Sequence, residues 1–175
     1  MRLDLAYTWY RKLLKEYQEK KQIYFLRGFK TPVIQSRDWE VFGSLLLNDK
    51  ANKGLGSDLQ NHEIKSAQVG NSFEYQYARI SGMKKWHHES SIDHLLISYE
   101  KDYMDITARL LPAHMANAIM KEWFLKIEEA YYQGKPRQRC RLAIPYDYVV
   151  DYGAVVFRTC DSKLFIETNI CCLEK

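Results

Sequence analysis

Hydrophobic positions near the start of the chain recur every three or four residues, which is the spacing of one face of a helix. From residue 2 to residue 21 the apolar face consists of Leu3, Tyr7, Tyr10, Leu14 and Tyr17. A second run of this kind extends from about residue 37 to residue 49, and Ser36 is placed to cap its first turn. Its inward side chains are Trp39, Phe42, Leu45, Leu46 and Val41. The pattern therefore predicts that the chain begins with two amphipathic helices.

Strand patterns follow these two helices. Residues 62–68 and 72–79 are predicted strands, and Gly70-Asn71 between them favours a hairpin turn. An apolar run over 94–99 and an alternating run over 103–110 predict a second pair of strands. A third pair is predicted at Ala154–Arg158 and Leu164–Thr168.

Helical patterns separate the strands. Residues 80–90 favour a helix or a loop, and Pro112 opens a long helical run, 112–133, which ends at Gly134. Pro145 can begin a short helix that reaches Tyr152. Strands interleaved with helices predict an α/β (α+β) fold, in which helices flank one mixed β-sheet. A chain of 175 residues suits a single domain, 1–175.

Composition restricts the class of protein. Hydrophobic residues make up 46% of the chain, which excludes a disordered protein. No apolar run approaches the ~20 residues of a membrane helix, and the charged N-terminus lacks the apolar centre of a signal peptide. The four cysteines, Cys140, Cys160, Cys171 and Cys172, have no C-x-x-C spacing, so we expect reduced thiols rather than structural zinc. The expected protein is cytoplasmic and has no membrane partner.

The charge of the chain is mildly basic, with a net charge of +4 and a pI of about 8.8. This balance is compatible with a polyanionic partner but does not require one. Lys135, Arg137, Arg139 and Arg141 alternate along the chain, so an extended segment would point four cations one way. Such a row suits the phosphate backbone of DNA, although the same residues can simply promote solubility.

The segment from Gly54 to Ser66 carries the strongest candidate chemistry. Glu63 and Lys65 share one face of the predicted strand, and Asp58 lies in the glycine-rich turn before it. Two converging carboxylates can bind a hard cation such as Mg²⁺, and a neighbouring ammonium can steady the charge that develops on a phosphate. Considered without context, the same spacing is more often found in a solvated hairpin.

The order of these runs resembles the PD-(D/E)xK nucleases, in particular the small PvuII-like type II restriction endonucleases. The similar segments are Gly54-Leu55-Gly56-Ser57-Asp58, Glu63-Ile64-Lys65-Ser66, His94-Leu95-Leu96-Ile97-Ser98-Tyr99, Ile106-Thr107-Ala108-Arg109-Leu110-Leu111-Pro112, and Ile144-Pro145-Tyr146-Asp147-Tyr148-Val149-Val150-Asp151-Tyr152-Gly153. They extend over roughly residues 54–157. The resemblance implies a restriction-endonuclease-like fold, with Asp58, Glu63 and Lys65 as catalytic residues and Asp58 and Glu63 as ligands of Mg²⁺.

Two departures from the family pattern concern the metal ligands. Fewer residues separate Asp58 from Glu63 than in the family, so the connection between them must be tight. The family also has a glutamate three residues before its aspartate, where this chain has Leu55. Glu40, on the second predicted helix, is a candidate for a further carboxylate ligand, but this residue can equally face solvent.

Candidates for DNA contact follow the catalytic strand. The resemblance places base-reading residues there, and glutamine suits adenine, arginine suits guanine, and glutamate can accept a hydrogen bond from cytosine. The candidates are Glu74, Gln76, Tyr77, Arg79 and Lys84, together with Arg137, Arg139 and Arg141. The alternative is a half-buried strand with Phe73, Tyr75 and Tyr77 in the core and polar residues facing outward. His87 and His88 diverge on a helix, which favours a polar patch over a metal site.

The sequence is compatible with three functions. The first is a homodimeric type II restriction endonuclease that cleaves double-stranded DNA at a short palindromic site, with residues 1–35 as a candidate dimerisation element and 36–175 as the catalytic and DNA-binding core. The second is a repair or junction-resolving nuclease that reads DNA shape. The third is a non-catalytic DNA-binding domain. The chain contains no G-x-x-x-x-G-K-[ST] loop and no arrangement that supports a serine or cysteine nucleophile.

Overall fold

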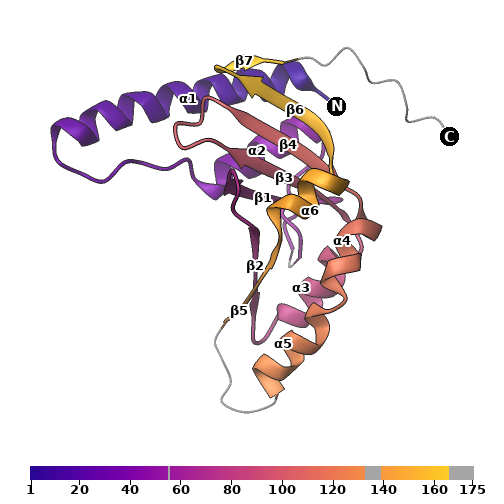
Figure 1. The fold of residues 1–175 in the computed structure, drawn as a ribbon. Helices are drawn as coiled ribbons and strands as arrows, with labels where there is room; N and C mark the ends of the chain where they lie inside the picture. The colour runs from indigo at the N-terminus through magenta and orange to yellow at the C-terminus, as the bar shows by residue number, and fades with distance from the viewer. Residues whose placement is uncertain (55, 133–138, 166–175) are drawn as a thin grey trace.

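The computed structural model describes residues 1–54, 56–132 and 139–165 (Figure 1). Its helices are α1 (Leu3–Leu26), α2 (Ser36–Leu47), α3 (Gly82–Glu89), α4 (Ala113–Met120), α5 (Trp123–Tyr132) and α6 (Tyr146–Tyr152). Its strands are β1 (His62–Gln68), β2 (Phe73–Ala78), β3 (Asp93–Tyr99), β4 (Ile106–Leu111), β5 (Arg139–Ile144), β6 (Ala154–Cys160) and β7 (Lys163–Leu164). The predicted mixed α/β class is confirmed.

Five of the strands form a mixed sheet in the order β1-β3-β4-β6-β7. β1 pairs with β3 in parallel, while β3 with β4, β4 with β6, and β6 with β7 are antiparallel. The pairing of β3 with β4 agrees with the predicted second strand pair. The third predicted pair forms as β6 and β7, and β7 ends at Leu164. Residues 166–168 of the expected strand lie outside the described residues.

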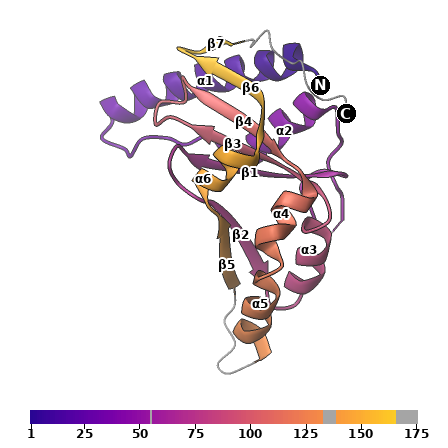
Figure 2. The ribbon, with the colours of Figure 1, turned by 45° about the vertical axis from the view of Figure 1, so that its right-hand side comes forward.

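The remaining two strands form a separate sheet, which corrects one prediction. β2 pairs antiparallel with β5 and does not form a hairpin with β1, although the predicted turn is present, with Gly70 at a φ of 83° and Asn71 N donating to Gln68 O at 2.9 Å. Figures 1 and 2 show the β2–β5 pair projecting away from the five-stranded sheet, with α3, α4 and α5 beside it. The turn therefore forms as predicted, but β1 remains the edge strand of the five-stranded sheet and β2 pairs with β5 instead.

Two hydrophobic cores lie on opposite faces of the five-stranded sheet. Leu95 and Ile97 of β3, with Ile64 of β1, pack in the core formed with α1 and α2. Leu96 and Ala67 point the other way, into the core formed with β2, β5 and helices α3 to α6. Because side chains alternate along a strand, Glu63 and Lys65 share the face of Ala67. The polar pair therefore lies between the sheet and the β2–β5 unit.

The structure revises the predicted helices in detail. α1 extends to Leu26, about one turn beyond the expected end. Ser36 does not cap α2, because the helix begins at that residue, its N-cap is Gln35, and no side-chain cap forms. The long helix expected over residues 112–133 is two helices, α4 and α5. At the break, Trp86 Nε1 donates to the carbonyl oxygen of Met120 at 2.8 Å, a tertiary contact that sequence periodicity does not reveal.

Two further observations complete the fold. The short helix expected after Pro145 is present as α6, and it ends at Tyr152 before Gly153. Among the residues that the structure describes, no helix is both long enough and apolar enough to cross a membrane.

Candidate active site

A short loop between α2 and β1 brings Asp58 to Glu63. Ala51 and Leu59 form an antiparallel bridge, Asn52 N donates to Asp58 O at 3.0 Å, and Leu59 N donates to His62 O at 3.0 Å. Gly56 has a φ of 138°, a conformation that suits glycine, and a Cβ there would lie 3.2 Å from the ring of His88. The few residues between Asp58 and Glu63 therefore suffice, because the loop turns back on itself.

Asp49, at the base of this loop, joins its two ends. The Asp49 carboxylate accepts hydrogen bonds from Lys50 N at 2.8 Å and Asn61 N at 2.9 Å, and it lies 2.8 Å from His62 Nδ1. Burial alone would raise the pKa of Asp49, but these hydrogen bonds hold it below its ordinary value. The loop that presents Asp58 is thus closed at its base by a buried carboxylate.

Asp58 and Glu63 also hold each other in place. Asp58 N donates to Glu63 Oε2 at 3.0 Å, and Ile64 N donates to Asp58 Oδ2 at 3.2 Å. One carboxylate oxygen of each residue therefore fixes the backbone near the other residue, while Glu63 Oε1 remains directed at Lys65. Both acidic side chains are oriented before any ligand binds.

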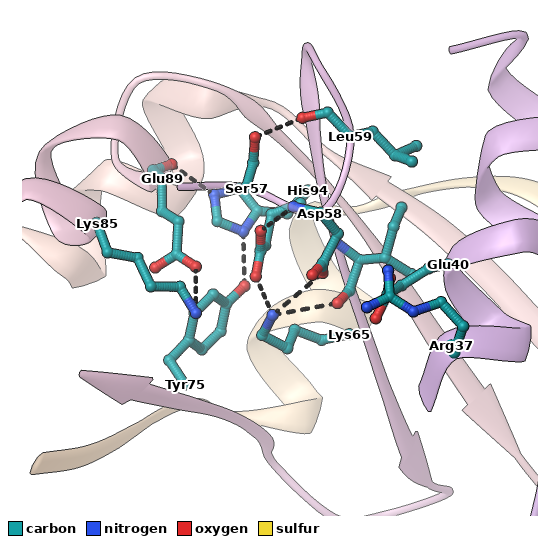
Figure 3. A network of polar contacts seen from close by, with 12 residues as sticks. Arg37, Glu40, Ser57, Asp58, Leu59, Lys65, Tyr75, Lys85, Glu89 and His94 are labelled. Atoms are coloured by element: carbon teal, nitrogen blue, oxygen red, sulfur yellow. Dashed lines mark hydrogen bonds and ion pairs between the residues drawn. The ribbon is translucent and has the colours of Figure 1, made fainter. Parts of the chain in front are cut away.

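Three oxygen atoms converge on the ammonium nitrogen of Lys65. Lys65 Nζ donates to Glu63 Oε1 in a short contact, to the backbone oxygen of Ile64 at 3.2 Å, and lies 3.5 Å from Asp58 Oδ2 (Figure 3). The ammonium also lies 5.0 Å from the centre of the Tyr75 ring. The side chain of Glu63 is fully buried, and those of Lys65 and Asp58 are 17% and 25% exposed. The structure thus brings together the three residues that the sequence singled out, around one positive charge.

The charges of this cluster shift its pKa values. Burial raises the pKa of Asp58, and Lys65 only partly offsets this rise. Burial would likewise raise the pKa of Glu63, but the Lys65 ammonium outweighs it and the pKa of Glu63 is lowered. For Lys65 burial acts to lower the pKa, yet the carboxylates of Glu63 and Asp58 raise it above its ordinary value. Glu63 and Lys65 therefore stabilise each other in their charged forms.

A cleft of about 280 Å³ opens over Lys65. It is lined by Ser36, Trp39, Glu40, Asp58, Ile64, Lys65, Ser66, Glu74, Gln76 and Lys85, which come from α2, the loop before β1, β1, β2 and α3. Glu40 lies at its wall, where burial and then Asp58 raise the pKa of Glu40. Its Oε2 accepts from Arg37 at 2.5 Å. The helix therefore brings Glu40 to the cleft rather than into open solvent, with its carboxylate paired to an arginine.

A buried polar network lies behind Lys65. Burial lowers the pKa of His94 to about 4, so its ring is neutral at pH 7. His94 Nε2 lies 2.9 Å from the carbonyl oxygen of Glu89, which can only accept, so this nitrogen carries the proton. His94 Nδ1, 2.6 Å from the Tyr75 hydroxyl, then accepts from that hydroxyl. The chain of bonds from α3 to His94 to Tyr75 fixes the aromatic ring beside Lys65 (Figure 3).

Glu89 itself is a fully buried carboxyl group. Lys85 Nζ lies 3.3 Å from its Oε1, and its carboxyl group also interacts with the side chain of Glu63. Burial and then the neighbouring Glu63 raise the pKa of Glu89 to about 8. The two acids therefore differ at neutral pH: Glu63 is ionised, and Glu89 retains its proton.

The candidates for DNA contact lie in different parts of the structure. Glu74 and Gln76 are exposed on β2 and line the cleft, and their register partners on β5 are Ala143 and Arg141. Arg139 is also exposed on β5 and lies 3.5 Å from Gln76 Oε1. The paired residues place one polar face of the β2–β5 sheet next to Lys65.

The other candidates lie away from this face. Tyr77 is 0% exposed and belongs to the core, so its assignment as a DNA contact is wrong, and the expectation of a buried aromatic face holds for Phe73, Tyr75 and Tyr77. Arg79 and Lys84 are exposed but do not line the cleft. Arg137 and Lys135 lie outside the described residues.

Sequence reasoning missed Lys85, Glu89 and His94. Nothing in the local spacing distinguishes Lys85 from Lys84, and Glu89 stands on a short helix without a motif. The one available signal was His94, a polar residue at the start of a strand that is otherwise buried and apolar. A histidine at such a position needs hydrogen-bond partners in the core.

Comparison with models of known protein families and with curated protein sequences gives no match for this chain. Among the residues that the structure describes, no three histidine, cysteine, aspartate or glutamate side chains form a group that could hold a metal ion. The candidate cation ligands are two carboxylates and a backbone carbonyl.

Proposed function

We propose that this protein is a Mg²⁺-dependent nuclease that hydrolyses phosphodiester bonds in double-stranded DNA. The observation that carries the proposal is the convergence of Asp58 Oδ2, Glu63 Oε1 and Ile64 O on the ammonium of Lys65. These three oxygens surround a single positive charge, the Lys65 ammonium. A bound cation would contact the same three oxygens.

The ligand set fits Mg²⁺. This ion takes oxygen ligands and keeps several of its waters, so one or two carboxylates are enough to hold it. Asp58 and Glu63 would supply these carboxylates, and Ile64 would supply its carbonyl oxygen. Bound there, Mg²⁺ would activate a water for attack on phosphorus and offset the charge that develops on the phosphate.

The protein residues prepare this chemistry in three ways. The bonds between Asp58 and the start of β1 orient the carboxylates in advance, which lowers the reorganisation that cation binding requires. The Lys65 ammonium has three donors, so it can donate hydrogen bonds to a phosphate oxygen once a cation takes over the carboxylates. Tyr75 limits where that ammonium moves.

The finer proposal is a type II restriction endonuclease that acts as a homodimer on a short palindromic site. Glu74 and Gln76 support base reading, because they line the same cleft as Lys65 and donate or accept hydrogen bonds as base edges require. The far end of α1 supports a second copy of the chain as partner. Ile23, Phe25 and Leu26 are 58%, 84% and 79% exposed there, and such apolar groups favour a protein interface.

Digestion of a supercoiled plasmid tests the proposal. Purified protein is incubated with Mg²⁺ or with EDTA, and the ends of any product are sequenced. Discrete fragments with one common end sequence, formed only with Mg²⁺, support a restriction endonuclease. Mg²⁺-dependent cutting at branched DNA alone would favour a junction-resolving nuclease, and DNA binding without any cutting would leave a non-catalytic binding domain.

A further inference from the structure

Lys85, on α3, is a second cation in the cleft. Its side chain is 28% exposed and lines the cleft together with Lys65. Its charge also acts on the acidic cluster, because it counteracts the burial that raises the pKa values of Asp58, Glu63 and Glu89. Among the described residues that line this cleft, Lys65 and Lys85 are the cations.

The two lysines differ in what already binds them. The ammonium of Lys65 contacts three oxygens, from Asp58, Glu63 and Ile64. The ammonium of Lys85 lies 3.3 Å from one carboxylate oxygen of the described residues, Glu89 Oε1. An ammonium has three donors, so Lys85 retains the capacity to bind a further anion at the cleft.

The contact with Lys85 explains why a buried acid stands at position 89. A buried carboxyl group is costly, and packing alone would favour an apolar residue at this position. Glu89 lies one helical turn after Lys85 on α3, so its Oε1 can hold the lysine ammonium at the wall of the cleft (Figure 3). The buried acid thus limits the conformations of a long, flexible side chain.

We propose that Lys85 binds a phosphate group of the nucleic-acid backbone, next to the phosphodiester that lies over Lys65, and that Glu89 is its positioning residue. The substrate class, a phosphodiester, rests on the proposed function. The cleft is otherwise rich in acids, with Glu40, Asp58 and Glu74 at its walls, and these would repel a polyanion. Lys85 offsets this repulsion on the side of α3, and it binds phosphate as a point charge that needs no particular base.

Salt-dependent DNA binding tests the role of Lys85. The affinity for a duplex is measured at several salt concentrations in EDTA, so that no cleavage interferes. Lys85→Ala should weaken binding roughly 10-fold to 100-fold and reduce the slope of log affinity against log salt by about 1, the value for one lost phosphate contact. Lys126→Ala removes the same charge from an exposed position on α5 and should change neither quantity. Lys85→Arg should restore the slope.

A second set of variants tests Glu89 and guards against misfolding. Glu89→Met, which has no oxygen to accept from the Lys85 ammonium, should weaken binding in the wild-type background and have no effect when Lys85 is already alanine, because Glu89 acts through Lys85. If Lys85→Ala alone fails to fold, Lys85→Met combined with Glu89→Gln removes the ammonium together with the buried acid and should show the same loss of slope.

The outcomes separate this inference from the proposed function. Wild-type affinity and slope in Lys85→Ala would overturn the inference, while Mg²⁺-dependent cutting by the same preparation would leave the nuclease intact. If Lys85→Ala reduces the slope of log affinity against log salt, while the wild type binds DNA but never cuts it, the phosphate site is supported and the nuclease function is overturned. A wild type that neither binds nor cuts DNA would overturn both.

Discussion

Replacement of Glu89 by glutamine should make the protein more stable at neutral pH, and the gain should grow as the pH rises. The Glu89 side chain is fully buried, and burial together with Glu63 raises its pKa from the ordinary value of 4.5 to about 8. Glutamine has nearly the same shape but cannot ionise. The substitution therefore removes the cost of a buried carboxylate without opening a cavity.

The sign and the size follow from proton linkage. The folded protein retains the Glu89 proton up to a pH of about 8, whereas the unfolded chain loses it near its ordinary pKa of 4.5. Between these values the folded state binds more protons, so the free energy of unfolding falls as the pH rises. Each pKa unit corresponds to about 1.4 kcal/mol. Between roughly pH 5 and pH 7 the wild type should lose about 2–3 kcal/mol relative to Glu89→Gln.

Urea unfolding, followed by tryptophan fluorescence at several pH values, measures this difference. Glu129→Gln is a matched control, because Glu129 is an exposed carboxylate on α5. The free energies of unfolding of wild type and control should run parallel with pH, while those of Glu89→Gln diverge upward. A constant difference between Glu89→Gln and wild type over this range would refute the reasoning. A stabilised Glu89→Gln, together with weaker DNA binding by Glu89→Met, would show an acid retained for function at a cost in stability.

Three further predictions follow from the site and from α1. Lys65→Ala should abolish cleavage but retain specific DNA binding, as gel shift and digestion together would show; near-wild-type cutting would contradict its role. Gln76→Ala should cost ~1–3 kcal/mol on the cognate duplex and relax preference at one base pair, whereas Arg139→Ala should weaken binding evenly across sequences. A uniform loss for Gln76→Ala would place base reading elsewhere. Phe25→Glu should convert a dimer to a monomer in light scattering, and an unchanged mass would exclude this end of α1 as the interface.

Local patterns predict well those parts of the fold that depend on one element at a time. The alternation around Glu63 and Lys65 predicts that both lie on one face of β1, and they do, because Ile64 between them is buried in the core formed with α1 and α2. The glycine-rich turn was expected to carry Asp58 toward the same face, and the hydrogen bonds across the loop show that it does.

Features that depend on distant partners were not predictable in this way. β2 lies one turn after β1 but pairs with β5, more than sixty residues later, a pairing of distant segments that no local pattern reveals. The break between α4 and α5 has no proline or glycine to announce it, and it coincides with the hydrogen bond from Trp86 to Met120. Lys85 and Glu89 likewise acquire a role only when α3 packs beside the cleft.

The central claim is that Asp58, Glu63 and Ile64 hold a catalytic cation. Its most direct test is the single-turnover rate of duplex cleavage as a function of Mg²⁺ concentration, measured for the wild type and for Asp58→Asn. The wild-type rate should be zero in EDTA and saturate with Mg²⁺. Asp58→Asn should not cleave at any Mg²⁺ concentration. Cleavage in EDTA, equal rates for the two proteins, or a wild type that never cuts would contradict the claim.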